Sequence, residues 1–352
     1  MILKQDGSVW STGYNRHGQL GDGSIADGFI FAWTSLADAK AVAAGSVHSL
    51  VLKQDGSVWT TGKNANGQLA DGSRISRTAF VKVVSRGALA VAAGREHSML
   101  LKEGGVVFTT GWNNFGQLGD GSAKDKTGFM RVIAGGVVAI AAGDVHSIVL
   151  KHDGSVWAAG RNYNGQLGDG SRNDKKSFVR VVSNDAIDVA AGGYHSLVLM
   201  EDGDVWATGW NEYGQLGDST TSETTSYVKV LSSGAKAVAA GSRHSMVLKQ
   251  DGSVWAAGYN HYGQLGDGST TDRQVFVEVI SDGVKAIAAG SSHSMALKAD
   301  GEIFVTGSNE FGQFGVDSII STSTFVSLTD FQRGERHITI TKTMIGLRIS
   351  VI

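Results

Sequence analysis

The chain has 352 residues, 41% of them apolar, which is enough for a sizeable core. Its net charge of −2 excludes a general electrostatic attraction to nucleic acid or membranes, and the absence of cysteine excludes disulfides, thiol catalysis and zinc–thiolate sites. No apolar run approaches the ~18 residues of a membrane span and no secretory leader is visible, so a cytoplasmic protein is expected, with the nucleus as the alternative.

One ten-residue phrase, first written GYNRHGQLGD from Gly13, occurs seven times. Its glutamine returns every 49 residues without insertion or deletion, at Gln19, Gln68, Gln117, Gln166, Gln215, Gln264 and Gln313. A unit of this length repeated seven times indicates one closed architecture rather than a string of domains.

The unit from Ala237 to Val279 shows the expected elements in chain order. AVAAG (237–241) and HSMVLK (244–249) read as two short strands, and an Asp-Gly turn then leads to a third, VWAAG (254–258). A variable loop follows the GQLGD phrase and precedes a fourth strand, FVEV (276–279). Nothing has the period of a helix. Four antiparallel strands, repeated seven times, predict an all-β fold, a seven-bladed β-propeller whose radial closure hides strand edges.

Two sets of residues are expected to hold the blades together. The small residues of AVAAG suit the inner position, where blades crowd the axis. One repeat position carries large aromatic residues that are expected to pack between blades: Trp10, Trp59, Trp157, Trp206 and Trp255, with Phe108 and Phe304 as substitutes.

The propeller is expected to occupy residues 1–333, and residues 334–352 depart from the repeat. The AVAAGxxHS segment that should follow the seventh unit is missing there. Residues 338–344 alternate well enough to form a strand, so we expect them to pair beside Ile2 and Leu3 and close the ring. The alternative is an imperfect closure with a diverged tail.

The segments AAGxxHSxxLKxDGxVW and GxNxxGQLGD together resemble the repeat of the regulator of chromosome condensation family, over about residues 1–333. The resemblance implies a seven-bladed propeller. Members of that family include an exchange factor for the Ran GTPase that also binds chromatin, a plant UV-B photoreceptor, β-lactamase inhibitor proteins and scaffolds. The uniform spacing leaves no room for the exchange factor's wedge in the first six repeats. The xx positions before the repeat histidine lack the photoreceptor's tryptophans.

Strand direction places every strongly variable position on one face, the top face. It comprises the xxHS corners, the GxNxxGQ loops and the loops after GQLGD. Aromatic residues there offer large contact areas with few rotors to freeze, as an interface requires. The alternative is that these rings only shield the core. The predicted partner-binding residues are Tyr14, Arg16, His17, Trp112, Phe115, Tyr163, Tyr194, Trp210, Tyr213, Arg243, Tyr259, His261, Tyr262 and Phe311.

Charge divides around the top face. A basic sector comprises Arg74, Arg77, Lys124, Lys126, Arg161, Arg172, Lys175 and Lys176, and the later repeats carry Glu212, Glu223 and Glu310. Such asymmetry could orient a protein partner, although an ordinary solvated surface explains it equally well. Nucleic acid is an unlikely partner, because nothing resembles a groove reader or a base-stacking platform.

The repeated polar residues have structural interpretations. Each repeat histidine (48, 97, 146, 195, 244 and 293) is expected to brace its own blade rather than to share a metal, and the Asn and Gln of GxNxxGQ to bond loop backbone. No nucleophile elbow, phosphate loop or catalytic dyad is visible, so no enzyme activity, cofactor or metal is expected.

The predicted function is a non-enzymatic scaffold that binds a protein partner through the top face. Guanine-nucleotide exchange on a Ran-like small GTPase and glycan binding are the alternatives. The protein is expected to be a monomer or to self-associate through the same face.

Overall fold

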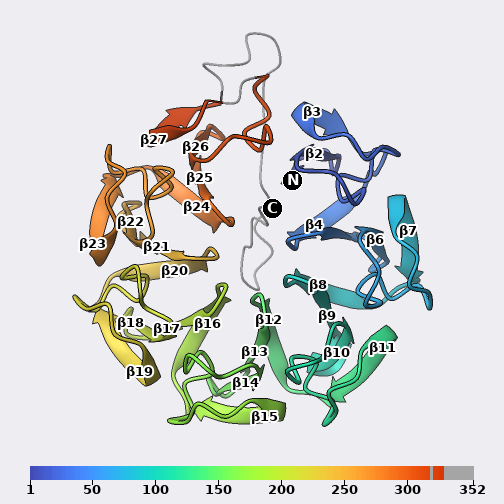
Figure 1. Cartoon of the computed structure of the whole chain (residues 1–352), viewed down its shortest axis with the longest axis horizontal. Coiled ribbons are helices and arrows are strands. Elements are labelled where there is room, and N and C mark those ends of the chain that lie inside the picture. The colour runs from blue at the N-terminus through green and yellow to red at the C-terminus, as the bar shows by residue number, and fades with distance from the viewer. Residues whose placement is uncertain (318–319, 329–352) are drawn as a thin grey trace.

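The computed structural model describes residues 1–317 and 320–328. It is a ring of seven antiparallel blades, which confirms the predicted β-propeller (Figure 1). Six blades have four strands, and in the part of the chain that is described the N-terminal blade has three. No described segment forms a helix able to span a membrane.

The first three blades contain the following strands: β1 (Ile2–Leu3), β2 (Val9–Gly13) and β3 (Gly28–Trp33); β4 (Ala39–Ala44), β5 (His48–Lys53), β6 (Val58–Gly62) and β7 (Arg77–Val84); β8 (Ala88–Ala93), β9 (His97–Lys102), β10 (Val106–Gly111) and β11 (Lys126–Ile133). A short 3₁₀ turn, η1 (Glu103–Gly105), replaces the Asp-Gly turn of the third blade.

The remaining four blades contain β12 (Val137–Ala142), β13 (His146–Lys151), β14 (Val156–Gly160) and β15 (Lys175–Val182); β16 (Ala186–Ala191), β17 (His195–Met200), β18 (Val205–Gly209) and β19 (Thr224–Leu231); β20 (Ala235–Ala240), β21 (His244–Lys249), β22 (Val254–Gly258) and β23 (Arg273–Ile280); β24 (Val284–Ala289), β25 (His293–Lys298), β26 (Ile303–Gly307) and β27 (Thr322–Ser327).

Each blade runs from an inner strand beside the axis to an outer strand at the rim (Figure 1). The AVAAG segments form the inner strands, as their small residues predicted, and Ala239 of β20 pairs with Met246 of β21. Each four-stranded blade thus matches the predicted order of strands. The inner strand β20 begins two residues before its AVAAG segment, and the outer strand β23 is longer than its apolar run suggested.

The core lies between blades rather than within them. One apolar cluster joins Leu197 and Val205 of the fifth blade to Val238 and Val247 of the sixth, and Trp255 packs against it. The same inter-blade packing occurs at Trp10, Trp59, Phe108, Trp157 and Phe304. A lysine ammonium lies over each of these six rings, and that of Lys249 is 3.9 Å from the ring centre of Trp255.

Five of the six repeat histidines bond to the neighbouring blade, so the expectation that each braces its own blade was wrong. Nε2 of His48 lies 2.8 Å from Oγ of Ser98 in the next blade, and that hydroxyl donates to the carbonyl oxygen of Gln68 at 2.8 Å. Because the serine hydroxyl donates its only hydrogen to the carbonyl oxygen, the imidazole must donate a hydrogen bond to the serine from Nε2. The serine lies 50 residues further along the chain than the histidine, so a short sequence pattern does not reveal that they pair.

We call this arrangement the His–Ser–Gln relay. The described part of the chain contains five complete relays: His48–Ser98–Gln68, His97–Ser147–Gln117, His146–Ser196–Gln166, His195–Ser245–Gln215 and His244–Ser294–Gln264.

Two incomplete relays flank the three-stranded blade. Oγ of Ser49 donates to the carbonyl oxygen of Gln19, but within residues 1–317 and 320–328 no histidine completes this pair. Nε2 of the buried His293 has no hydrogen-bond partner among the described residues. The first and last blades are nonetheless joined. Ile30 forms a β-bridge with Val316, and the hydroxyl of Thr12 donates a hydrogen bond to the carbonyl oxygen of Gly312. The closing strand expected at 338–344 lies outside the described residues.

Candidate interaction face

Polar side chains inside each GxNxxGQ loop fix its shape. In the third repeat, Nδ2 of Asn113 donates to Oδ1 of Asp120 at 3.0 Å, and its Oδ1 accepts from the backbone nitrogen of Leu118 at 2.9 Å. Oε1 of Gln117 accepts from the backbone nitrogen of Phe115 at 3.1 Å. Asn and Gln therefore bond the loop, as predicted, and the variable residues between them are held on a rigid frame.

The loop also rests on the neighbouring blade. Gly116 has φ +81°, and a Cβ at this position would lie 2.5 Å from Cα of Lys176 in β15. Only glycine combines that conformation with so close an approach. Asp120 then forms a bridge with Ser177 of the same strand, so each loop spans two blades.

Backbone bonds bring the two kinds of variable position together. The residue after the first glycine of the loop donates to the carbonyl just before the repeat histidine, as Trp210 does to Tyr194 at 2.8 Å and Tyr259 to Arg243 at 2.9 Å. The predicted top face is therefore a continuous surface of xxHS corners and GxNxxGQ loops.

Most of the predicted aromatic residues touch one another in a chain that we call the aromatic arc. It runs through ring contacts at centroid distances of 5.9 Å (Tyr194–Trp210), 5.3 Å (Trp210–Tyr213), 4.8 Å (Tyr213–Tyr259) and 4.5 Å (Tyr259–His261). Tyr262 adjoins Tyr259, and Trp112 contacts Phe115 at 5.3 Å. The contacts are mainly edge-to-face, the favoured geometry for ring pairs.

Two arginines complete the arc. The guanidinium carbon of Arg161 lies 4.9 Å from the ring centre of Phe115 and 5.6 Å from that of Tyr194, so it joins the Trp112–Phe115 pair to the rest. Arg243 lies between Trp210, Tyr213 and Tyr259.

Tyr163 joins the arc through Arg161, whose guanidinium carbon lies 5.9 Å from its ring centre, and the rings of the arc differ in exposure. Tyr163 is 65% exposed and Tyr262 41%, whereas Tyr194, Trp210, Tyr213 and Tyr259 are half-buried.

The other predicted aromatic residues form a separate group. Tyr14 contacts Phe311 at 5.3 Å and His17 at 6.2 Å across the junction of the first and last blades. Arg16 is exposed beside them. The structure thus brings the predicted residues together in two places rather than one.

The basic sector is largely neutralised by acidic residues, which the sequence interpretation did not anticipate. Arg77, Lys126 and Lys175 each pair with the aspartate of their own GQLGD or GQLAD phrase, at 2.7, 3.0 and 2.9 Å. Arg74 pairs with Asp125 and Arg172 with Glu223, both in the neighbouring repeat. Lys124, Arg161 and Lys176 have no ion pair among the described residues.

Asp120 illustrates this local neutralisation. Burial acts to raise the pKa of its carboxyl, but bonds from Ser122, Lys126 and Asn113 outweigh burial and hold the pKa below its usual value. The positive charge of Lys126 is therefore part of the loop's structure.

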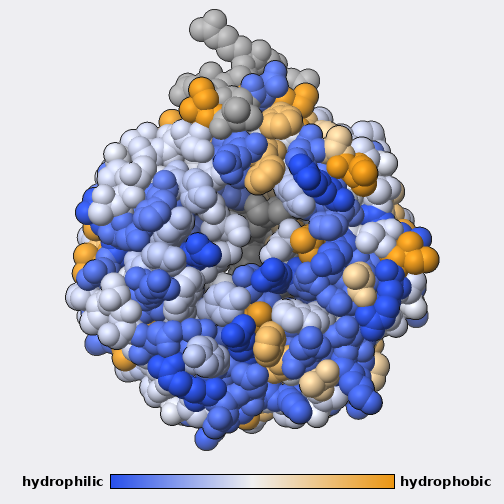
Figure 2. Space-filling model, in the orientation of Figure 1, coloured by the Kyte–Doolittle hydropathy of each residue, from blue (hydrophilic) through white to orange (hydrophobic). Residues whose placement is uncertain are grey.

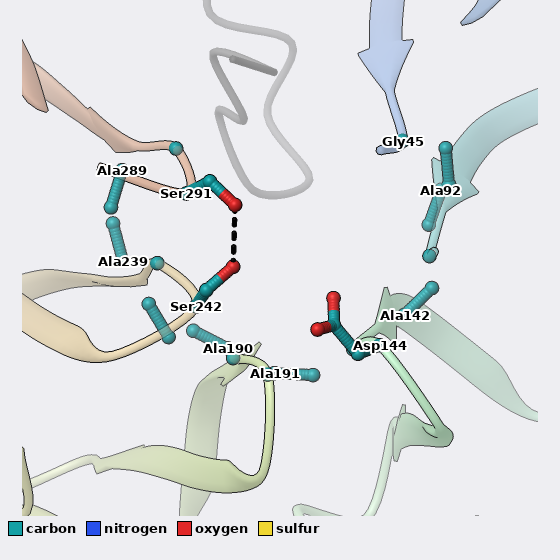
Figure 3. A pocket seen from close by; sticks show the side chains of 18 of the residues that line it. Gly45, Ala92, Ala142, Asp144, Ala190, Ala191, Ala239, Ser242, Ala289 and Ser291 are labelled. Carbon is teal, nitrogen blue, oxygen red and sulfur yellow. Dashed lines mark hydrogen bonds between the residues drawn. The ribbon is translucent and has the colours of Figure 1, made fainter. Parts of the chain in front are cut away.

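A hollow of about 150 Å³ lies on the axis of the ring, where the surface is hollowed at its centre (Figure 2). Small residues of the inner strands line it, and Oγ of Ser242 lies 2.8 Å from Oγ of Ser291. The carboxylate of Asp144 points into this hollow (Figure 3). Burial raises its pKa to about 6, against the opposing effect of Arg95 and Arg243.

Two features of the surface were missed from the sequence. Asp144 is a single acidic residue at an xxHS corner, and nothing in its pattern distinguishes it. Phe29, Ile30 and Trp33 of β3 are 38%, 59% and 53% exposed, a signal readable as the apolar run GFIFAW. Across residues 1–317 and 320–328, no three His, Asp or Glu side chains gather as metal ligands do.

The RCC1-like domain family model matches residues 86–346 of this sequence, about three quarters of the chain. The protein belongs to this family. RCC1 repeat models also match residues 39–68 and 55–101 of this RCC1-like chain. Among curated proteins, no sequence matches it.

Three solved structures share the RCC1-like fold at a TM-score of 0.83. Yeast RCC1 (Prp20) bound to Kap60 is 20% identical, over 93% of this chain and 85% of that one. Prp20p of Saccharomyces cerevisiae, studied for its binding to Gsp1p and histones, is 22% identical, over 93% and 87%. Human WBSCR16 is 25% identical, over 91% and 94%.

Proposed function

We propose that this RCC1-like propeller is a non-enzymatic scaffold that binds a protein partner through the aromatic arc of its top face. The supporting observation is the unbroken series of ring contacts from Tyr194 to Tyr262. Rings that already restrain one another lose little freedom on binding, and aromatic residues dominate the energetics of protein interfaces.

A pull-down from lysate with quantitative mass spectrometry tests the proposal. The comparison is between the wild type and a triple variant, Trp112→Ala, Trp210→Ala and Tyr213→Ala, whose folding is verified by circular dichroism. A matched control carries Trp33→Ala, an exposed aromatic residue on the outer strand β3. We expect partners that the control retains and the triple variant loses. Equal recovery by both variants would mean that the arc is only packing.

Nucleotide exchange on a small GTPase is the second candidate. It is favoured by the fold shared with Prp20p, which was studied for its binding to Gsp1p. The test is release of a fluorescent guanine nucleotide from a Ran-like GTPase, and no acceleration by this protein would end the idea. Glycan binding, self-association through the top face and the cytoplasmic or nuclear location stay predictions.

A further inference from the structure

Arg161 and Arg243 are each surrounded by three aromatic rings. The guanidinium carbon of Arg161 lies 4.9, 5.9 and 5.6 Å from the ring centres of Phe115, Tyr163 and Tyr194. That of Arg243 lies 5.8, 5.6 and 5.5 Å from the ring centres of Trp210, Tyr213 and Tyr259. The same environment therefore occurs twice along one arc.

These two arginines differ from most cations around them. Within residues 1–317 and 320–328, neither guanidinium has a carboxylate oxygen within 4.0 Å or a hydrogen-bond acceptor. Elsewhere on the top face of the described residues a carboxylate accompanies the cation in seven pairs: Lys63–Glu96, Arg74–Asp125, Arg77–Asp71, Lys126–Asp120, Arg172–Glu223, Lys175–Asp169 and Arg273–Asp267. The hydrogen-bonding capacity of Arg161 and Arg243 thus stays open to another molecule.

Aromatic packing prepares an arginine to bind a carboxylate. The rings stabilise the cation through its attraction to their π faces while leaving its N–H groups unused. They also restrict a flexible side chain, so less entropy is lost when a ligand binds. A planar guanidinium then accepts a carboxylate in a two-point geometry that lysine cannot provide.

We propose that the aromatic arc recognises an acidic peptide segment, whose carboxylates bind Arg161 and Arg243 while its apolar side chains pack on the rings between them. This inference rests on the proposed function and specifies its partner. A nucleic acid fits less well, because phosphate chains require many unpaired cations. Here Glu212 and Asp272 lie in the same loops as arc residues, and the chain is net negative.

The test is a selection from a random peptide library displayed on phage, followed by sequencing of the bound pool. We expect the wild type to enrich Asp and Glu, with apolar residues between them. Arg161→Gln together with Arg243→Gln removes two positive charges, and we expect it to abolish the acidic enrichment. For an individual selected peptide, fluorescence polarisation should show binding weakened by at least about tenfold per arginine.

Matched and conservative variants separate specific recognition from net charge. Arg131→Gln with Arg180→Gln removes the same charge from exposed positions on the outer strands β11 and β15, and should leave the enrichment intact. Arg243→Lys keeps the charge but loses the planar fork, and should still weaken binding.

Three outcomes would overturn the inference: no enrichment, an enriched pool without acidic excess, or equal acidic excess with the Arg161/Arg243 variant. Preferential binding of a single-stranded oligonucleotide over the selected peptides would also overturn it. A neutral pool that the Trp112/Trp210/Tyr213 variant loses would reject this inference alone and leave the proposed function standing.

Discussion

The six repeat histidines should make the propeller unstable in mild acid. Burial lowers their pKa values to about 3 (His48, His146, His195 and His293) or about 4 (His97 and His244), from 6.5. As the pH falls below 6.5, the unfolded chain binds protons at these sites while the folded chain does not. Protons therefore favour unfolding, and stability is lost between about pH 6.5 and 4.

The magnitude follows from the size of these pKa shifts. At about pH 5.5, each buried histidine reduces the free energy of unfolding by about 1.4 kcal/mol relative to neutral pH, and the six together by about 8 kcal/mol. Asp144 acts in the opposite direction, because its raised pKa favours folding as the pH falls, but by only about 1 kcal/mol. The net loss is comparable to the whole stability of many domains, about 5–15 kcal/mol.

Thermal and urea unfolding, followed by tryptophan fluorescence and far-ultraviolet circular dichroism, would measure this effect. We expect a steep loss of stability between about pH 6 and 5, with a slope that approaches about five protons: about six from the histidines, less about one from Asp144. His152→Gln, at an exposed histidine, is the control and should leave the slope unchanged. A melting temperature that stays constant from about pH 7.5 to 5 would refute the reasoning.

Three further predictions concern the axial hollow, one loop and the tail. Asp144→Asn should raise the free energy of unfolding, measured in urea at about pH 7.5, by about 1–3 kcal/mol. This gain should shrink as the pH falls through 6 toward 4, because the wild-type carboxyl is then neutral. A gain that stays constant with pH would contradict this. Gly116→Ala should destabilise by about 3 kcal/mol in the same assay, because its Cβ would meet the Lys176 backbone. Gly121→Ala should cost only about 1 kcal/mol, because its φ is similar but its Cβ would lie at an ordinary contact distance of 3.7 Å from Oγ of Ser177. Equal losses would count against the steric account. Deleting residues 334–352 should lower the melting temperature by about 5 °C or more if this segment closes the first blade; an unchanged value would dismiss the closing strand.

The ring and its blades were predictable because one chemical pattern repeats without interruption. The Asp-Gly turns, the small inner residues and the paired Asn and Gln each describe local geometry, and local geometry is what a short sequence pattern encodes. The relay was not predicted, because the histidine and its serine partner belong to different repeats. The available signal for the relay was that a serine directly follows each repeat histidine.

The site was less predictable than the fold, for the same reason. The pairing of Asp120 with Lys126 and of Asp169 with Lys175 recurs at a spacing of six residues and could have been read from the sequence. Arg172 instead pairs with Glu223, 51 residues away, so its neutralisation depends on how blades meet. The contacts between aromatic rings on the top face likewise depend on how neighbouring blades pack.

The identical relays also bear on how many blades the ring can hold. Each one joins a histidine to the serine of the following blade, so it sets the same rotation from one blade to the next. The same junction therefore recurs at five of the seven blade interfaces among the described residues. Removing one 49-residue repeat would leave every remaining junction chemically intact, yet the circle could no longer close at that rotation. Such a chain should open at one seam or recruit a blade from a second molecule.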